Sequence, residues 1–254
     1  MGREGAQLSI VVPVYNEASG LARSVDELEG WSADLGVSWE LLLVDDGSQD
    51  SSLELMRSLS RTRPWLRPLR LGCHLGRGRA LREGMRQATG RVLLTTEADG
   101  SWDPRGLRSL VRSALADEAD VVLASPHRRG AGLVGVPLGR RLLSRGASLA
   151  TRLLLGHGLT MATGMTRAYR AEVVPRILSD LPGKEFHADV LCRALQSGLR
   201  ILELPVQLSW RPERRARRSS GGLLEWVPSA CQHLALLATC GWALRRDARR
   251  AGAP

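Results

Sequence analysis

Four short apolar runs recur through the first half of the chain. They are Leu8–Val14, Trp39–Val44, Arg91–Thr96 and Asp120–Ala124. Nearly continuous apolar runs of this length are typical of strands that are buried on both faces of a parallel sheet. The pattern therefore predicts at least four strands of this kind.

The stretches between these runs have helical spacing. Apolar side chains fall on one helical face in three sets: Leu21, Val25, Leu28 and Trp31; Leu53, Met56 and Leu59; and Leu107, Leu110, Val111 and Leu115. Alternation of strands and helices predicts an α/β domain in three layers, with a mostly parallel central sheet and helices on both faces.

The second half is less regular. It predicts an arginine-rich helix over 138–155, a short strand over 164–169, helices over 172–178 and 186–196, and an edge strand over 199–208 that contains Pro205. A basic segment, RPERRARRSSGG, follows at 211–222. We expect one domain over residues 1–220 and a C-terminal helical appendage over 221–254.

The appendage contains a mostly apolar stretch from Leu223 to Leu244, which is long enough to cross a bilayer. Glu225, Pro228, Gln232 and His233 interrupt it, so an amphipathic helix at a membrane interface fits better than a spanning one. Arginines flank the stretch on both sides, which suits anionic lipid headgroups. A helix packed against the domain, with a solvated basic end, is the alternative.

Composition narrows the class of protein. The 254 residues are 43% hydrophobic and 24% charged, which excludes a disordered chain. Thirty-six basic residues against 26 acidic ones give a net charge of +10 and predict attraction to phosphates. The basic residues are spread and carry no nucleic-acid motif, which disfavours a nucleic-acid partner.

The cysteines and the first residues bear on the compartment. Four cysteines without a CxxC pair argue against a zinc site and a disulfide framework. The first apolar stretch is too short for a secretory signal peptide. We therefore expect a reduced, cytoplasmic setting.

Three polar clusters follow predicted strands. They are Pro13–Glu17, Asp45–Ser48 and Glu97–Gly100. Ligands of open α/β sheets bind beyond the carboxyl ends of the strands, so these clusters should share one edge. Carboxylates brought together there need cations or hydrogen-bond donors, which a divalent metal and a nucleotide supply.

The spacing of Glu97 and Asp99 points to a metal. Alternate side chains of an extended segment face the same way, so both carboxylates could bind one Mg²⁺ or Mn²⁺. Such an ion stabilises a departing nucleotide diphosphate. A further segment, His74–Ala80, contains Gly76 and Gly78 before a helix. It matches neither a Walker A loop nor a complete GxGxxG motif, so a structural role for its glycines is favoured over phosphate binding.

Together these motifs resemble a known family. VVPVYNE, VDDGS, a Gly-x-Gly-x-Ala helix start and an acidic x-Asp motif occur in the order seen in family 2 glycosyltransferases with the GT-A fold. The segments RRLLSRGAS (140–148), TGMTRAYR (163–170), FHAD (186–189) and RPERRARRSS are similar to the dolichol-phosphate mannosyltransferase group. The resemblance covers about residues 8–220.

The resemblance implies roles for individual residues. Those implied to hold the nucleotide sugar are Pro13, Tyr15, Glu17, Val44, Asp46, Glu97, Ala98 and Asp99. Those implied at the metal, which is Mg²⁺ or Mn²⁺, are Glu97, Asp99 and Ser101. Those implied in catalysis are Asp99, Arg140, Arg214 and Asp189. The two arginines would meet phosphates of donor and acceptor, because guanidinium suits bidentate phosphate contacts. Asp189 would orient an arginine.

The implied reaction moves a hexose, mannose or glucose, from a nucleotide-diphosphate sugar to a polyprenyl phosphate with inversion, on the cytoplasmic face of a membrane. An anionic phosphate nucleophile reduces the need for a general base. Two alternatives stay open. One is transfer to a saccharide hydroxyl, with Asp189 or Glu185 as the base, and the other is a binding module without catalysis. The chain departs from the group at Glu97 (Asp), Ser101 (Gln), His74 (Asn) and Pro126 (Arg).

Overall fold

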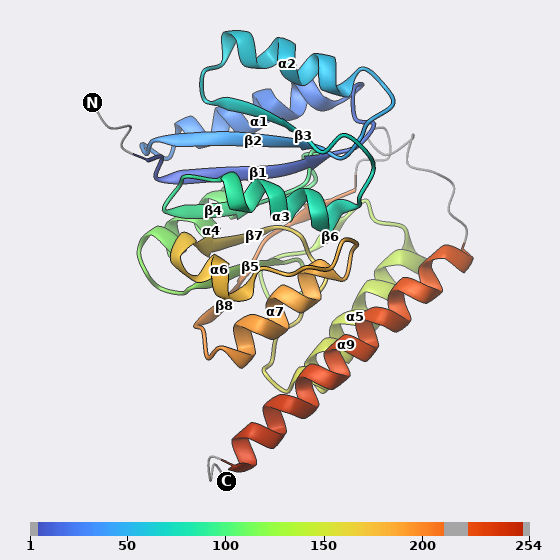
Figure 1. Cartoon of the computed structure of the whole chain (residues 1–254). Coiled ribbons are helices and arrows are strands. Elements are labelled where there is room, and N and C mark those ends of the chain that lie inside the picture. The colour runs from blue at the N-terminus through green and yellow to red at the C-terminus, as the bar shows by residue number, and fades with distance from the viewer. Residues whose placement is uncertain (1–4, 211–222, 251–254) are drawn as a thin grey trace.

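A computed structural model describes residues 5–210 and 223–250, with side chains of the last helix described over 231–246. A seven-stranded sheet forms its centre, in the order β3-β2-β1-β4-β7-β5-β8 (Figure 1). The strands are β1 (Leu8–Val14), β2 (Trp39–Asp45), β3 (Leu66–Arg70), β4 (Val92–Thr95), β5 (Val121–Ser125), β7 (Arg167–Arg170) and β8 (Ile201–Pro205). β7 is antiparallel to both neighbours and the other pairings are parallel.

Helices cover both faces of the sheet. One face packs against α1 (Leu21–Ala33), α2 (Ser52–Thr62) and α4 (Pro104–Leu115). The other packs against α3 (Arg77–Gln87), the 3₁₀ turn η1 (Ala171–Val173), α6 (Val174–Ile177) and α7 (Phe186–Gln196). The apolar runs of β1 and β2 are buried from both sides, which gives two cores, one on each face of the sheet.

Two long helices lie side by side along one flank of the molecule. α5 (Leu138–Leu155) runs next to α9 (Leu223–Arg250), which also packs on α7 (Figure 1). The helices approach closely at Gly241, where a Cβ atom would lie only 1.8 Å from the carbonyl oxygen of Leu154. Within the described residues, no helix combines the length and apolar character needed to cross a bilayer.

A small parallel pair, β6 (Leu133–Val134) and β9 (Leu208–Ser209), lies apart from the main sheet. β9 brings the chain back to the segment after β4, because Trp102 forms a bridge with Leu208. The last described residue before the basic segment, Trp210, donates its amide to the carbonyl of Val134 at 2.8 Å.

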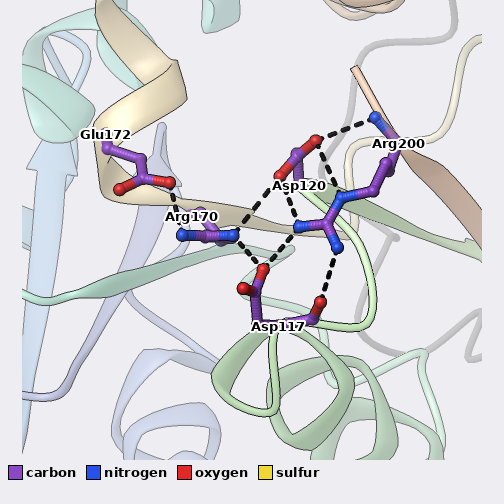
Figure 2. A network of polar contacts seen from close by, with 5 residues as sticks. All are labelled: Asp117, Asp120, Arg170, Glu172 and Arg200. Atoms are coloured by element: carbon purple, nitrogen blue, oxygen red, sulfur yellow. Dashed lines mark hydrogen bonds and ion pairs between the residues drawn. The ribbon is translucent and has the colours of Figure 1, made fainter.

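A network of ion pairs lies at the edge of the sheet where the parallel strands begin (Figure 2). Arg200, just before β8, donates to Asp120 at 2.9 Å and also contacts Asp117. Arg170, at the end of β7, contacts Asp117, Asp120 and Glu172. The network therefore connects α4, β5, β7 and β8 away from the clusters predicted to bind ligand.

The expected α/β fold is confirmed, as are α5 and α7 at their predicted bounds. The C-terminal helix exists and continues to Arg250 rather than ending at 244. The helix expected over 172–178 is wrong in detail, because η1 and the short α6 divide that stretch. The strand expected over 164–169 is shorter and covers 167–170. The expected edge strand ends at Pro205, which has no backbone N–H to donate to a neighbouring strand. The proposed domain boundary at 220 lies outside the described residues.

Candidate active site

The first two polar clusters are joined at the carboxyl edge of the sheet. β1 and β2 are parallel neighbours with Val14 opposite Asp45, so the segments that follow them meet. The amide of Asn16 donates to Ser48 Oγ at 3.0 Å, and that of Glu17 donates to Ser52 Oγ at 2.9 Å. Asp45, buried at the same edge, accepts the amide of Ser48 at 3.1 Å. The motif after β1 is thus held by the motif after β2.

Asp50 completes this junction. Its carboxylate accepts the hydroxyl of Ser52 at 2.5 Å and the amide of Ala18 at 3.1 Å. Burial raises the pKa of Asp50, but these hydrogen bonds outweigh it and lower the pKa below the ordinary value. Asp50 therefore stays ionised and holds the start of α1 in place.

Asp46 is buried and anchors the loop after β3. Its Oδ1 accepts the amides of Leu75 at 2.8 Å and Gly76 at 3.1 Å, and its Oδ2 lies 2.9 Å from Nδ1 of His74. The ring of His74 stacks on Tyr15, with centroids 4.0 Å apart and 27° between the planes. The side chain of His74 is about half exposed. Tyr15 and Asp46, which were both predicted at the nucleotide, thus both contact His74, and the sequence did not predict this.

A close backbone approach makes this arrangement possible. Gly47 has a φ of +73°, and a Cβ there would lie 2.4 Å from the carbonyl carbon of Cys73. Any other residue at position 47 would be strained and would push the two loops apart.

The glycines before α3 serve packing. A Cβ on Gly78 would lie 2.4 Å from the carbonyl oxygen of Leu181, and the amides of Gly78 and Arg79 donate to the carbonyl of Pro182 at 2.7 and 3.2 Å. Because that carbonyl takes two amides at the start of α3, the geometry fits the structural role favoured from the sequence.

The third cluster follows β4, the other neighbour of β1. Glu97 Oε2 accepts the indole Nε1 of Trp102 at 2.7 Å and is 3.4 Å from Ser101 Oγ. Asp99, which is buried, accepts the amide of Ser101 at 3.0 Å through Oδ1. The carbonyl of Ala98 accepts the hydroxyl of Ser24 from α1. All three acidic segments therefore lie at the edge formed by β2, β1 and β4.

The side chains of this third cluster could supply only part of the ligands that a divalent cation needs. Within residues 5–210 and 223–250, no three His, Cys, Asp or Glu side chains are grouped to hold a metal ion. Mg²⁺ is commonly held by one or two carboxylates, with substrate phosphates and water completing the shell, so Asp99 and Glu97 fit this mode. The contacts of Glu97 with Trp102 and Ser101 are both made by Oε2. Glu97 also lines a small cavity of about 20 Å³, together with Trp31 of α1 and Leu107 of α4.

The basic segment starts beside this cluster. The amide of Ser209 donates to the carbonyl of Ser101 at 2.7 Å, so β9 delivers the chain to the loop that carries Asp99. The guanidinium of Arg140, in the first turn of α5, lies 4.6 Å from the centre of the Trp210 ring. Arg140 is therefore close to the start of the basic segment, while Arg214 lies outside the described residues.

α7 brings a further predicted residue. Asp189 accepts Nε of Arg193 at 2.8 Å, one helical turn away, so Arg193 is an arginine that it orients. A residue that the sequence did not single out is Arg167. It is buried and donates to the carbonyls of Ala162 at 2.5 Å, Gly164 at 2.8 Å and His187 at 2.7 Å. Arg167 thereby joins the loop before β7 to the first turn of α7.

The remaining predicted residues differ in what they expose. The side chain of Val44 is buried in the core on the α3 face, so only its backbone could reach a ligand. Pro13, Tyr15 and Glu17 are half-buried at the edge. The sequence marked His74 only as the start of the His74–Ala80 segment and as a departure from the mannosyltransferase group, and neither signal predicts its contacts with Tyr15 and Asp46.

The family model described as glycosyl transferase family 2 matches residues 9–178, which is most of the sheet and all three acidic segments. The chain belongs to this family. Two relatives are an undecaprenyl-phosphate mannosyltransferase of Micrococcus luteus (31% identical, covering 84% of this chain and 88% of the relative) and a polyprenol monophosphomannose synthase of Mycolicibacterium smegmatis (30%, 85% and 82%).

The fold of this family 2 glycosyltransferase is similar to that of solved structures. Glucosyl-3-phosphoglycerate synthase from Mycobacterium tuberculosis, in complex with Mn²⁺, UDP and glucosyl-3-phosphoglycerate, superposes with a TM-score of 0.65. The match covers 93% of this chain and 80% of that one at 21% identity. The chain therefore has the GT-A fold expected from its motifs.

Proposed function

We propose that this glycosyltransferase transfers a hexose, mannose or glucose, from a nucleotide-diphosphate sugar to a polyprenyl phosphate with inversion at the anomeric carbon. The observation that carries the proposal is the meeting of the three acidic segments with the start of the basic segment, through the Ser209–Ser101 backbone bond. The two relatives are named for undecaprenyl-phosphate and polyprenol substrates, which supports a lipid acceptor.

In this proposal the edge beyond β1 and β2 holds the nucleoside. Tyr15 and His74 present an aromatic surface, and Asp46 fixes the loop that carries His74. Asp99, with Glu97 through Oε1, would hold Mg²⁺ or Mn²⁺ against the diphosphate, where such an ion supplies charge stabilisation for the leaving group. Ser101 stays a further ligand in the proposal through its hydroxyl.

Arginines would receive the phosphates. Arg140 of α5 lies over the ring of Trp210, the residue that precedes the basic segment, and Arg214 belongs to that segment. The acceptor oxygen is already anionic, so no residue has to remove a proton from it. Asp189 acts in this scheme by holding Arg193 rather than as a base. We place the protein peripherally on the cytoplasmic face of the membrane, where its lipid acceptor would be available.

The test is transfer with purified protein, a panel of nucleotide-diphosphate hexoses and polyprenyl phosphate, in the presence of Mn²⁺ or Mg²⁺. We expect turnover with at least one donor, loss on chelation with EDTA and recovery on adding the metal back. Asp99→Asn should lower the rate at least about a hundredfold, since it weakens the hold on the ion and the diphosphate.

Two controls separate the alternatives. Glu118→Gln changes an exposed acid after α4 and should leave the rate unchanged. Asp189→Asn should slow transfer only modestly if Asp189 orients Arg193, whereas complete loss with intact donor binding would favour a base acting on a saccharide hydroxyl. Donor binding without turnover for any acceptor would favour the binding module instead.

A further inference from the structure

α5 is amphipathic in the reverse of the usual sense. The side chains that it buries against the domain include two hydroxyls, those of Ser148 and Thr151, together with Leu155. Its remaining face should be polar if it met only water, because a surface helix normally turns its apolar side inward. The structure places leucines there instead.

Four of these leucines form a continuous stripe. Leu138, Leu142, Leu149 and Leu153 are separated by four, seven and four residues, which at 3.6 residues per turn puts them within an arc of about 60°. Each is between 57% and 70% exposed. We refer to these four residues as the leucine stripe. A contiguous exposed apolar surface of this kind marks an interaction site.

The charge beside the stripe is of one sign. α5 contains Arg140, Arg141, Arg145 and Arg152 and has no acidic residue. Arg145 and Arg152 are exposed and lie seven residues apart, along one border of the leucine stripe. Arginines with long apolar stems beside leucines suit a surface with anionic groups above hydrocarbon.

α9 adds to this flank. Trp242 is one of the most exposed large side chains, and the guanidinium of Arg246 lies 5.0 Å from the centre of its ring. Tryptophan and arginine are typical of the boundary between headgroups and acyl chains. α5 and α9 lie side by side (Figure 1), and α5 follows β6, whose Val134 accepts the amide of Trp210 just before the basic segment.

We propose that the leucine stripe of α5 is a docking surface that inserts into the headgroup boundary of an anionic phospholipid bilayer. This rests on the proposed function, since it places Arg140 and the acidic edge next to the membrane that would hold the acceptor. A second copy of the chain fits less well, because a two-fold contact through the stripe would set Arg145 and Arg152 against the arginines of the other copy.

Two adjacent leucines provide a matched test. Leu142 lies in the stripe and Leu143 does not, yet both are exposed to 59%. Binding of wild type, Leu142→Gln and Leu143→Gln to vesicles is measured by sedimentation, with phosphatidylcholine alone and with added phosphatidylglycerol. Leu142→Gln should weaken binding to the anionic vesicles about fivefold or more. Leu143→Gln should stay within about twofold of wild type.

The charge is tested separately with Arg152→Gln, which should weaken binding to anionic vesicles and reduce its dependence on salt. Transfer is then measured with polyprenyl phosphate in vesicles and with a short, water-soluble prenyl phosphate. Leu142→Gln should slow only the reaction in vesicles, because it leaves the acidic edge unchanged.

Three results would overturn the docking surface. Leu142→Gln could bind vesicles as wild type does, it could slow the water-soluble reaction equally, or sedimentation velocity could show a wild-type dimer that Leu142→Gln dissociates. The proposed function fails in a different way. If wild type transfers to neither acceptor while vesicle binding still depends on Leu142, the surface stands and the assigned reaction does not.

Discussion

At the scale of the residue, buried polar groups organise the site. Asp46 gathers two backbone amides and the ring of His74, and Arg167 gathers three carbonyls from two segments. Both are nearly inaccessible to water, so each contact replaces hydration that the group lost on folding. Such residues support the loops around the site whether or not they touch a substrate.

Asp46→Ala removes the acceptor of the Leu75 and Gly76 amides. We expect a loss of about 1–3 kcal/mol in the free energy of unfolding, because two partly buried amides lose their acceptor. Nucleoside diphosphate binding should weaken too, as His74 loses its support. Denaturant unfolding and calorimetry measure the two effects. Asp46→Asn, which retains one acceptor oxygen, should fall between wild type and alanine, and an alanine variant as stable as wild type would contradict this account.

Arg167→Lys keeps the charge but loses the planar fork that reaches Ala162, Gly164 and His187. One ammonium cannot serve all three carbonyls, so unfolding should become easier by about 2–5 kcal/mol. Urea titration followed by circular dichroism measures this. Arg152→Lys, on the exposed side of α5, is the control and should stay near wild type. Equal stability of the two variants would argue against the bridging role.

At the scale of the element, close packing decides which helices can meet. α9 contacts α5 where Gly241 faces the carbonyl of Leu154, and Arg245 donates to the same carbonyl at 3.0 Å. α4 is fixed at its start, where Asp103 caps the helix by accepting the amide of Gly106 at 3.2 Å and Pro104 occupies the first turn. An aspartate followed by proline is a sequence signal for a helix start, and both residues act in this way at α4.

Gly241→Val should separate α9 from α5, because a side chain there would overlap the carbonyl oxygen of Leu154. We expect α9 to become sensitive to limited proteolysis and the thermal midpoint to fall. Gly146→Ala is the matched control, since its Cβ would enter open space on α5 and should stabilise the helix by about 0.5–1 kcal/mol. Protection of α9 in the valine variant would show that the contact is not needed.

The elements differ in how well their sequence predicts them. β1 and β2 are nearly continuous apolar runs because they are buried on both faces, and their bounds were predicted to within a residue. β3 had no predicted range, since Arg67, Pro68 and Arg70 interrupt a strand that lies at the sheet edge and is only partly buried. The stretch around Pro175 had helical spacing, yet proline removes a donor and η1 takes over.

The site shows the same division. The sequence predicted that the three acidic segments share an edge, because parallel strands of one sheet end at the same edge, and the structure confirms it. The contact of Glu97 with Trp102 and the stacking of His74 on Tyr15 depend on side-chain directions in loops, which spacing does not specify. The reach of Arg167 across segments far apart in the chain depends on tertiary packing.

At the scale of the whole molecule, charge is concentrated differently at the two edges of the sheet. Carboxylates that could meet a ligand gather at one edge. At the other edge, carboxylates are paired with arginines in the network of Asp117, Asp120, Arg170, Glu172 and Arg200 (Figure 2). Hydrogen bonds from Arg200 lower the pKa of Asp120 below its ordinary value, and they lower the pKa of Asp117 in the same way. The network thus connects strand starts from both halves of the chain.

A lowered carboxyl pKa has a definite sign for stability. The folded state binds protons less readily than the unfolded state, so this contribution is complete above the unfolded pKa of about 3.9 and is lost as the pH falls through the folded value. Asp120→Asn should therefore lower the thermal midpoint at neutral pH and flatten its decline in acid. Scanning calorimetry from neutral pH into acid measures this. Asp34→Asn, which breaks one exposed ion pair with Arg108, should change little.

The hydrogen bonds around β9 limit where the polypeptide can be shortened. Three successive amides of this segment donate to carbonyls that lie far away in the sequence. The amide of Leu208 donates to Gly132, that of Ser209 to Ser101 and that of Trp210 to Val134. A version that stops before Leu208 would deprive the Asp99 loop and β6 of these partners at once. A minimal enzyme without its tail must therefore retain Trp210, even though the family model ends 32 residues earlier, at 178.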